Sequence, residues 1–422
     1  MNFTPVPWSH STNIYEINLR QYTYEGTFTA FTEHLPRLKD MGVETLWFMP
    51  LTPIAVERRL GTLGSYYACA DYTSINPEFG TIADFKNFVS LAHEMGFKVI
   101  IDWVANHTGF GHTWTETHPE YYLHAEDGAF VLKHGWEDVI HLDYENPGLR
   151  NAMIEAMHFW LTEFNIDGFR CDMAHLVPLD FWQEARLSLD AAKKLFWLAE
   201  CEEPNYHEVF DATYSWKLLH TLESFWKRQT SIGGIDETLT WYEEAFAGFK
   251  LLFTSNHDEN SHSGSEYERL GDAAKAFAVL TCTWNGMPLV YSGQEAANTK
   301  RILFFDKDFI DWEAGLPLHG FYKTLLNLHS NNAALRGGDK LVTTERVSTD
   351  KNDKLFGFIR KNGAAEVLVF LNLSAEYYWM ELKDEGVGGE FVNVFTNEVN
   401  NITKNRYFEM QPWGFYVYEK DV

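Results

Sequence analysis

The sequence has few of the residues that would indicate disulfides, metal clusters or nucleic-acid binding. Basic residues are outnumbered, with 34 lysines and arginines against 60 aspartates and glutamates and a formal net charge of −26. This negative field repels phosphate backbones and anionic membranes, so we expect neither as a partner and favour a neutral ligand. Cysteines are also few, and no CxxC pair suggests zinc or redox chemistry. The four stand singly, at Cys69, Cys171, Cys201 and Cys282.

Long apolar runs are missing as well. No window of roughly eighteen apolar residues occurs, so no membrane span is expected. Residues 1–20 lack the basic start and apolar stretch of a signal peptide. Scattered cysteines are simplest to explain as reduced thiols. Together these features predict a cytoplasmic protein.

What the chain does have is length and aromatic mass. Its 422 residues can hold a barrel of about 250 residues and a smaller domain. Hydrophobic residues make up 45% and aromatic residues 16%, with fifteen tryptophans and twenty tyrosines. Two explanations of the aromatic excess stay open. The rings either add mass to the core or line a cleft in which they stack on sugar rings.

Short apolar runs alternate with segments of helical spacing. Apolar side chains recur at i, i+3, i+4 and i+7 in 81–97, where Gly96 is placed to end a helix, and 146–165 shows a similar pattern. Near-continuous apolar runs are typical of parallel strands covered on both faces. We therefore predict an α/β fold with a (β/α)8 TIM barrel. The eight predicted strands are 13–20, 44–50, 97–104, 166–173, 195–200, a weaker candidate at 209–214, 249–256 and 286–293.

The rest of the pattern predicts two additions to this barrel. A connection of unusual length, 108–146, follows the third strand and is predicted to be a short excursion domain. The barrel is then formed by 1–107 and 147–335. After this point the pattern changes to alternating strands, with a hairpin signal at Asn362-Gly363. Residues 336–422 are predicted to form a C-terminal antiparallel β-sandwich.

Polar clusters follow four of the predicted strands. The carboxyl ends of barrel strands meet at one face, so these side chains are expected to converge despite their distance in sequence. Taken singly, each has an ordinary structural explanation, such as a salt bridge, a helix cap or a turn. Their joint occurrence at four strand ends favours a catalytic site. The clusters are Asp102, Asn106 and His107; Arg170 and Asp172; Glu200; and Asn256, His257 and Asp258.

Three carboxylates in one pocket suit the hydrolysis of a glycosidic bond. One carboxyl group must keep its proton for the leaving oxygen, and another must stay ionised on the other side of the sugar. Arg170 beside Asp172 is expected to lower the pKa of Asp172, which indicates the nucleophile. Glu200 follows the apolar run "LFWLA", a setting that favours a protonated acid, although Glu202 and Glu203 are rivals.

Four segments, "DWVANHT", "GFRCDMAH", "LAECEEP" and "FTSNHDEN", resemble the signature regions of the α-amylase family of glycoside hydrolases (family 13). "GMPLVYSGQE", "DYTSINPEFGT" and "PWGFYVY" are also similar, so the resemblance covers nearly the whole chain. It implies a retaining mechanism with Asp172 as the nucleophile and Glu200 as the general acid/base. Asp258 matches the third carboxylate, which holds sugar hydroxyls.

The resemblance also implies substrate contacts. Arg170 would orient Asp172, and Asp102 would buttress the site. His107 and His257 would hydrogen-bond the sugar on the non-reducing side of the cut bond. Tyr67 matches a stacking tyrosine, with Tyr66 as the competing register.

Two positions depart from the family pattern. Members with a structural calcium pair the position of Asn106 with an aspartate, where this chain has His141. We therefore predict no required metal or cofactor. His175 stands where members acting on longer substrates carry a lysine, so it is included among the substrate-binding candidates.

The predicted activity is retaining hydrolysis of α-1,4-glucosidic bonds in α-glucans or maltooligosaccharides. Within the family, α-glucosidase, cyclodextrin hydrolase and glucan transferase activities are the alternatives. A non-catalytic glucan-binding homologue is a further alternative, against which the intact carboxylate trio stands. A metal-dependent hydrolase using His107 and His257 would have Arg170 competing with its cation. No pattern indicates an oligomeric state.

Overall fold

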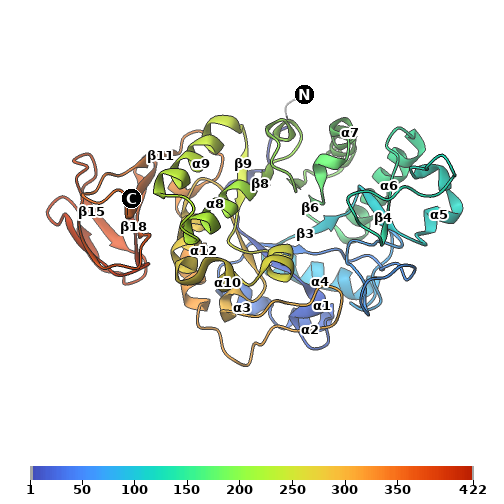
Figure 1. The fold of residues 1–422 in the computed structure, drawn as a ribbon, viewed down its shortest axis with the longest axis horizontal. Helices are drawn as coiled ribbons and strands as arrows, with labels where there is room; N and C mark the ends of the chain where they lie inside the picture. The colour runs from blue at the N-terminus through green and yellow to red at the C-terminus, as the bar shows by residue number, and fades with distance from the viewer. Residues whose placement is uncertain (1–2, 421–422) are drawn as a thin grey trace.

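The computed structural model describes residues 3–420, and eight parallel strands at its centre close into a barrel (Figure 1). The predicted barrel is confirmed, and each predicted apolar run contains one strand. Residues 1–2 and 421–422, which the sequence assigned to the barrel and the C-terminal domain, lie outside the described part. The strands are β1 (Ile14–Ile17), β2 (Thr45–Phe48), β3 (Lys98–Trp103), β6 (Gly168–Cys171), β7 (Phe196–Ala199), β8 (Ala212–Tyr214), β9 (Phe249–Leu252) and β10 (Met287–Tyr291).

The apolar runs are continuous because both faces of each strand are covered. One set of side chains, which includes Ile14, Trp47, Ile100 and Leu198, packs into a separate cluster that fills the barrel. The alternate set packs under the helices in the main core. Burying apolar area on both faces contributes about 25 cal/mol per Å². If every second residue were polar, one face of each strand would bury no apolar area, and about half of this stabilisation would be lost.

Helices surround the barrel. In α4 (Ile82–Glu94) the predicted apolar positions are buried, Thr81 and Asp84 form a capping box, and Gly96 adopts φ +82° after the last turn. The alternation is less regular than predicted, because only a 3-10 turn, Pro204–Glu208, separates β7 from β8. The other barrel helices are α1 (Leu19–Tyr22), α2 (Phe28–Thr32), α3 (Leu35–Asp40), α6 (Pro147–Phe164), α7 (Leu179–Asp190), α8 (Trp216–Trp226), α9 (Ile232–Ala245), α10 (Glu266–Leu270), α11 (Ala274–Thr283) and α12 (His319–Asn331).

The long connection after β3 carries its own small sheet. Strand β4 (His107–Gly109) pairs antiparallel with β5 (Val139–His141), so that His107 lies opposite His141. Helix α5 (Thr113–Thr117) lies between them in sequence. This ladder holds the excursion against the carboxyl end of β3.

The C-terminal part is antiparallel, as predicted. Its larger sheet has the order β11-β12-β13-β18-β15-β16, and β14 pairs with β17 in a second sheet. Side chains from both sheets share one apolar cluster. The predicted hairpin joins β12 to β13, with Gly363 at φ +62°. The strands are β11 (Thr343–Arg346), β12 (Leu355–Asn362), β13 (Ala365–Asn372), β14 (Tyr378–Glu381), β15 (Glu390–Asn393), β16 (Val399–Asn401), β17 (Tyr407–Met410) and β18 (Phe415–Lys420).

A buried contact fixes the C-terminal sheets to the barrel. Trp284, which follows α11, packs edge-on against Phe358 with ring centroids 4.8 Å apart. Arg360 is fully buried and donates to the carbonyl oxygens of Trp284 at 2.7 Å and Arg336 at 3.2 Å. Figure 1 shows the C-terminal sheets on the side of the barrel away from β4 and α5.

Between residues 3 and 420, no helix has the length and apolar character needed to cross a membrane.

Replacing Trp284 tests the strength of this contact. Trp284 is 5% exposed and Trp379 is 61% exposed. Trp284→Ala is expected to lower the free energy of unfolding by about 3–5 kcal/mol, because it leaves a cavity between the barrel and the C-terminal sheets. Trp379→Ala is the matched control and should change it by about 0.5 kcal/mol or less. Urea unfolding measures both values, and equal losses would contradict the assignment.

Candidate active site

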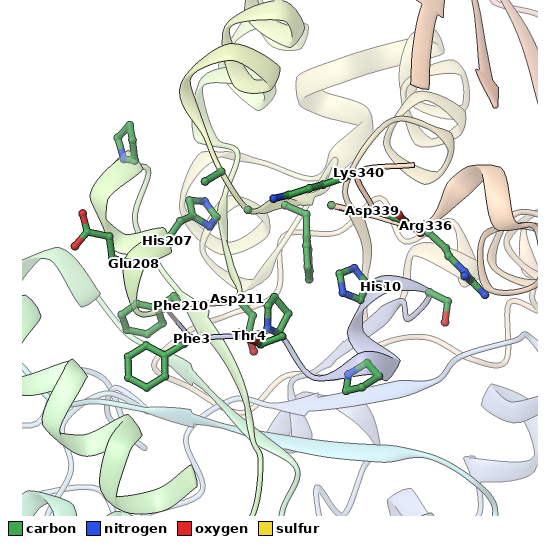
Figure 2. A pocket seen from close by; sticks show the side chains of 18 of the residues that line it. Phe3, Thr4, His10, His207, Glu208, Phe210, Asp211, Arg336, Asp339 and Lys340 are labelled. Atoms are coloured by element: carbon green, nitrogen blue, oxygen red, sulfur yellow. The ribbon is translucent and has the colours of Figure 1, made fainter. Parts of the chain in front are cut away.

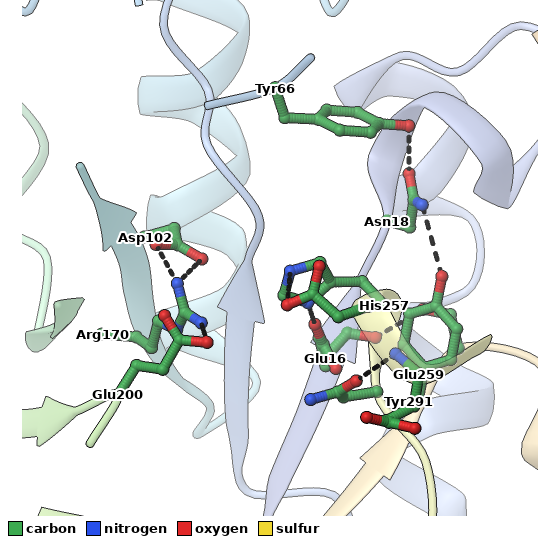
Figure 3. A network of polar contacts seen from close by, with 12 residues as sticks. Glu16, Asn18, Tyr66, Asp102, Arg170, Glu200, His257, Glu259 and Tyr291 are labelled. Atoms are coloured by element: carbon green, nitrogen blue, oxygen red, sulfur yellow. Dashed lines mark hydrogen bonds and ion pairs between the residues drawn. The ribbon is translucent and has the colours of Figure 1, made fainter. Parts of the chain in front are cut away.

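Arg170 joins several of the polar groups that end the barrel strands, and Figure 3 shows its guanidinium between Asp102 and Glu200. Its side chain is fully buried. Nη1 donates to Asp102 Oδ1 at 2.9 Å and to Asp172 Oδ1 at 3.0 Å, and Nε donates to the Tyr214 hydroxyl at 3.0 Å. Nη2 lies 2.9 Å from Glu200 Oε1 as an ion pair without hydrogen-bond alignment. One guanidinium therefore compensates three buried carboxylates.

The two oxygens of Asp172 have different surroundings. Oδ1 is held by Arg170, while Oδ2 is buried and has no hydrogen-bond partner within residues 3–420. Asp172 and Glu200 both line a cavity of about 500 Å³. Met173 adopts a left-handed φ of +41° directly after Asp172, and its N–H donates to Glu200 Oε2 at 2.8 Å. Buried polar atoms are nearly always paired, so an oxygen without a partner on an acid that lines the cavity calls for an explanation.

Tyr67 lines the cavity beside these carboxylates, whereas His257, a predicted sugar contact, is buried and does not line it. The Tyr67 hydroxyl donates to Asp102 Oδ2 at 3.2 Å and lies 2.6 Å from His257 Nε2, which is also 3.2 Å from Asp258 Oδ2. Tyr67 and Asp258 line the cavity, whereas Asp102 lies behind it. Tyr66 is buried elsewhere and donates to Asn18 Oδ1 at 2.8 Å. The geometry therefore favours the Tyr67 register over the Tyr66 register.

His107 lines the opposite wall. Its Nδ1 is 3.1 Å from Asn106 Nδ2, which is also 3.3 Å from His141 Nδ1. The ring of Trp136 lies 5.2 Å from that of His107 and stacks on His141 at 6.0 Å. Burial, with repulsion from neighbouring histidines, lowers the pKa of His107 to about 3, so the ring is neutral at pH 7.

These residues do not fit a calcium ion. Calcium takes six to eight oxygen ligands, whereas Asn106 faces two imidazole nitrogens. Across residues 3–420 no group of three or more His, Cys, Asp or Glu side chains has a metal-binding arrangement. The Asn106–His141 contact joins the β4–β5 excursion to the barrel by direct hydrogen bonding.

His175 is not brought into this cavity. It lies exposed on a 3-10 turn, Ala174–Leu176, and does not line the cavity beside Asp172. A larger cavity of about 1110 Å³ opens at the amino ends of the barrel strands, beside His10, His207 and Lys340 (Figure 2). It contains none of the site residues predicted from the sequence, so its greater size does not make it the catalytic site.

Sequence reasoning missed several contributors. Glu16, in the middle of β1, contacts His257, and a lone acid within the apolar run "NIYEINL" was the only signal for it. Tyr214 ends the weakest predicted strand. Most of the remaining cavity-lining residues lie on loops without a periodic pattern, and His262 lies on a short π-helical turn, Glu259–Ser263. The remaining lining residues include Leu60, Trp136, Glu137, Asp138, His262, Phe304 and Phe305.

Comparison with known proteins identifies the family. The family model described as "Alpha amylase, catalytic domain" matches residues 9–127 and 116–319. The chain belongs to the α-amylase family. It is therefore a glycoside hydrolase, as the resemblance predicted.

Relatives in the α-amylase family agree with this assignment. The α-amylase MalA of Haloarcula japonica is 28% identical over 392 residues, which cover 87% of this chain and 56% of the relative. The chain thus spans just over half the length of that relative. The maltogenic α-amylase AmyB of Thermotoga neapolitana is 29% identical with a TM-score of 0.85, covering 98% of this chain and 97% of AmyB. An α-amylase of Lactobacillus plantarum is 28% identical with a TM-score of 0.87, covering 98% and 100%.

The electrostatics of this α-amylase-family site differ from the sequence expectation. Burial raises the pKa of Asp172 to about 7, and the attraction of Arg170 does not overcome it. Burial also raises the pKa of Glu200 to about 7, in the predicted direction. For Asp258, burial is outweighed by His257 and other nearby cations, which bring its pKa to about 2. Arg170 is shared among three acids, so it cannot depress the pKa of any one strongly.

These pKa shifts predict that Asp172→Asn and Asp258→Asn change the free energy of unfolding in opposite directions. The folded pKa of Asp172, about 7, exceeds its ordinary 3.8, so its ionised form costs folding free energy above pH 7. Asp172→Asn should raise the free energy of unfolding by about 1–3 kcal/mol at pH 8, with little gain at pH 4. Asp258→Asn should lower it at pH 8, because its charged form is stabilised. Urea unfolding at both pH values tests this, and shifts of equal sign at pH 8 would contradict it.

The donor set around Asn106 predicts insensitivity to chelation. Dialysis against EDTA should leave the melting temperature within about 2 °C and the hydrolytic rate unchanged, because hydrogen bonds hold the excursion. Thermal unfolding before and after added Ca²⁺ is the second measurement. A rise of about 5 °C or more on adding Ca²⁺ would show that a cation site exists.

Proposed function

We propose that this enzyme hydrolyses α-1,4-glucosidic bonds in α-glucans or maltooligosaccharides with retention of configuration. Asp172 is the nucleophile, Glu200 the general acid/base, and Asp258 the carboxylate that holds the sugar. The observation that supports this most directly is the unpartnered Oδ2 of Asp172 beside the cavity, with Oδ1 fixed by Arg170. An attacking oxygen needs a lone pair that is free to bond the anomeric carbon, and its carboxylate must keep a fixed orientation.

The reaction proceeds in two displacements. Oδ2 of Asp172 forms a bond to the anomeric carbon as the bond from that carbon to the leaving oxygen breaks, and Glu200 gives that oxygen its proton. The product is a glycosyl ester on Asp172 with Glu200 ionised. Glu200 then removes a proton from water, and the hydroxide oxygen displaces Asp172 from the anomeric carbon. The two inversions at the anomeric carbon restore the α configuration. The proton taken from water leaves Glu200 protonated again, and Asp172 is released as the carboxylate.

The two displacements need Asp172 to be ionised and Glu200 to be protonated at the start. Burial raises the pKa values of Asp172 and Glu200 to about 7, and the charge of Asp172 adds to the rise at Glu200, so near neutral pH the two acids together hold about one proton. Of these two acids, Asp172 accepts an aligned hydrogen bond from the charged Arg170, whereas Glu200 accepts one from the neutral backbone N–H of Met173. Because a charge-assisted hydrogen bond favours the ionised form more strongly, we assign the shared proton to Glu200.

The walls of the cavity suit a neutral sugar. Tyr67 lies parallel to Phe304 with ring centroids 6.3 Å apart, and Trp136, from the excursion, lines the same cavity. Aromatic faces pack against the C–H faces of sugar rings, while His107 and Asp258 offer hydrogen-bonding groups. His175 and the exposed turn around it are assigned to longer substrates. No cofactor takes part in this proposal.

Cyclodextrin hydrolysis is the second candidate. Relatives named cyclomaltodextrinase and maltogenic α-amylase support it; the first, from a Bacillus species, is 23% identical and shares 83% of this chain and 66% of its own length. A cyclodextrin is cut by the same two displacements, so the catalytic assignments are unchanged. The non-catalytic alternative is disfavoured because all three carboxylates meet at one cavity.

The decisive experiment incubates maltoheptaose with wild-type enzyme, Asp172→Asn and the control Asp180→Asn. Asp180 is an exposed acid on α7 that pairs with Arg150 and does not line the cavity. Wild type and control are expected to release α-anomeric fragments, seen by NMR within the first minutes. Asp172→Asn should lose roughly a thousandfold or more in kcat. β-Anomeric products would contradict the role of Asp172, and faster turnover of cyclodextrins would favour the second candidate.

A further inference from the structure

Glu16 is a buried acid that the proposed chemistry does not use. It lies on β1, where its neighbours Tyr15 and Ile17 are apolar core residues, and its side chain is fully buried. Oε1 is 2.5 Å from His257 Nδ1, and Oε2 has no hydrogen-bond partner within residues 3–420. An ionised carboxylate buried in this way is costly unless a cation compensates it. The cation within reach is the ring of His257.

The hydrogen bonds around His257 define its protonation state. A carboxylate can only accept, so we assign the single proton of the Tyr67 hydroxyl to Asp102 Oδ2 at 3.2 Å. The hydroxyl oxygen is then the acceptor for His257 Nε2, 2.6 Å away. Asp258 Oδ2 also faces Nε2 at 3.2 Å. At the other nitrogen, Glu16 Oε1 is an acceptor. Both ring nitrogens therefore face acceptors, and only a doubly protonated imidazolium satisfies both.

We propose that Glu16 is a positioning residue that keeps His257 as an imidazolium and, through it, keeps Asp258 ionised and oriented toward the sugar. Glu16 does not line the cavity, so it acts without touching substrate. Its effect on turnover rests on the proposed function. Its effect on the protonation of His257 does not.

Other charged groups near His257 support the same state. Burial lowers the pKa of His257, but attraction to Asp258 and Glu16 outweighs it and holds the pKa well above its ordinary value. Asp102, from β3, adds a negative charge, whereas Arg170, from β6, opposes it. The remaining contacts are aromatic: Trp47 lies edge-on at 6.1 Å, and Phe304 is stacked at 6.5 Å.

Without the negative charge of Glu16, His257 should lose one of its two ring protons. In Glu16→Gln, the ring can keep one proton on Nδ1 for the amide oxygen and lose the proton on Nε2. A bare Nε2 then faces Asp258 Oδ2 at 3.2 Å, and two acceptors repel each other. Asp258 would lose the hydrogen bond that helps to lower its pKa to about 2. The carboxylate would turn away or take up a proton, and either change weakens its hold on the sugar hydroxyls.

The test compares wild type, Glu16→Gln, Glu16→Asp and a matched control. Glu295 is the control, since it is also fully buried in the barrel but pairs with Arg37 at 2.8 Å and not with His257. With ¹⁵N-labelled histidine, the His257 signal is assigned by its loss in His257→Gln. Wild type is expected to show two protonated ring nitrogens from pH 5 to pH 8. Glu16→Gln should lose one of these protons within that range.

Activity gives the second readout. In Glu16→Gln, kcat/KM should fall roughly ten- to hundredfold at pH 8 and much less at pH 5.5, because lower pH restores the imidazolium. Glu16→Asp keeps the charge and should regain part of the loss. Glu295→Gln should lower the melting temperature and leave the shape of the pH profile unchanged.

Two outcomes would overturn the inference. One is a wild-type His257 with a single ring proton at pH 7, which needs no variant to observe and so does not depend on Glu16→Gln folding. The other is a pH profile of Glu16→Gln parallel to that of wild type. If the wild type cleaves no α-glucan, the proposed function fails, while the NMR titration still decides the link between Glu16 and His257.

Discussion

A single buried cation, Arg170, holds the catalytic end of the barrel together. Its guanidinium reaches carboxylates from β3, from the end of β6 and from the end of β7, and a tyrosine from β8. A planar fork with fixed donor directions can serve several acceptors at once, which a lysine ammonium on a flexible stem cannot do with the same geometry. The strands supply rigid anchors, and the arginine converts their separate ends into one site. Without it, three desolvated negative charges would repel one another at the mouth of the barrel.

Sharing one cation among three acids also sets their protonation. The compensation is enough to bury Asp172 and Glu200 but leaves their pKa values near 7. Asp258 lies nearer to a second cation, His257, and stays ionised. Among the three acids that line the cavity and are proposed to act in catalysis, the site therefore has a proton-sharing pair, Asp172 and Glu200, and a permanent anion, Asp258. That division matches the chemical needs of a glycosidase more closely than three equally ionised carboxylates would.

The barrel was predictable from sequence because its cause is local. Strands buried on both faces must be apolar throughout, and all eight runs contain a strand. The carboxylates were predictable because each lies at the end of one of those strands or within a few residues after it. The missing helix between β7 and β8 was not, since a 3-10 turn leaves no periodic signal over Pro204–Glu208. The low pKa expected for Asp172 was wrong because sequence shows its neighbour Arg170 but not the two other acids that share it. The contact of Glu16 with His257 could not be predicted, because the two residues are 241 positions apart along the chain.

The ladder between β4 and β5 constrains how this enzyme's excursion can vary over evolutionary time. His107 begins β4 and also lines the cavity, and its position is set by pairing with His141. Side chains alternate across a ladder, so a slip of one residue would turn His107 away and bring Thr108 to the cavity side. Insertions between residues 110 and 138 leave the register intact, whereas a single-residue deletion inside either strand does not. The length of this segment can therefore vary, whereas the two paired strands at its ends cannot. Such changes alter the rim of the cavity and leave the carboxylates beneath it in place.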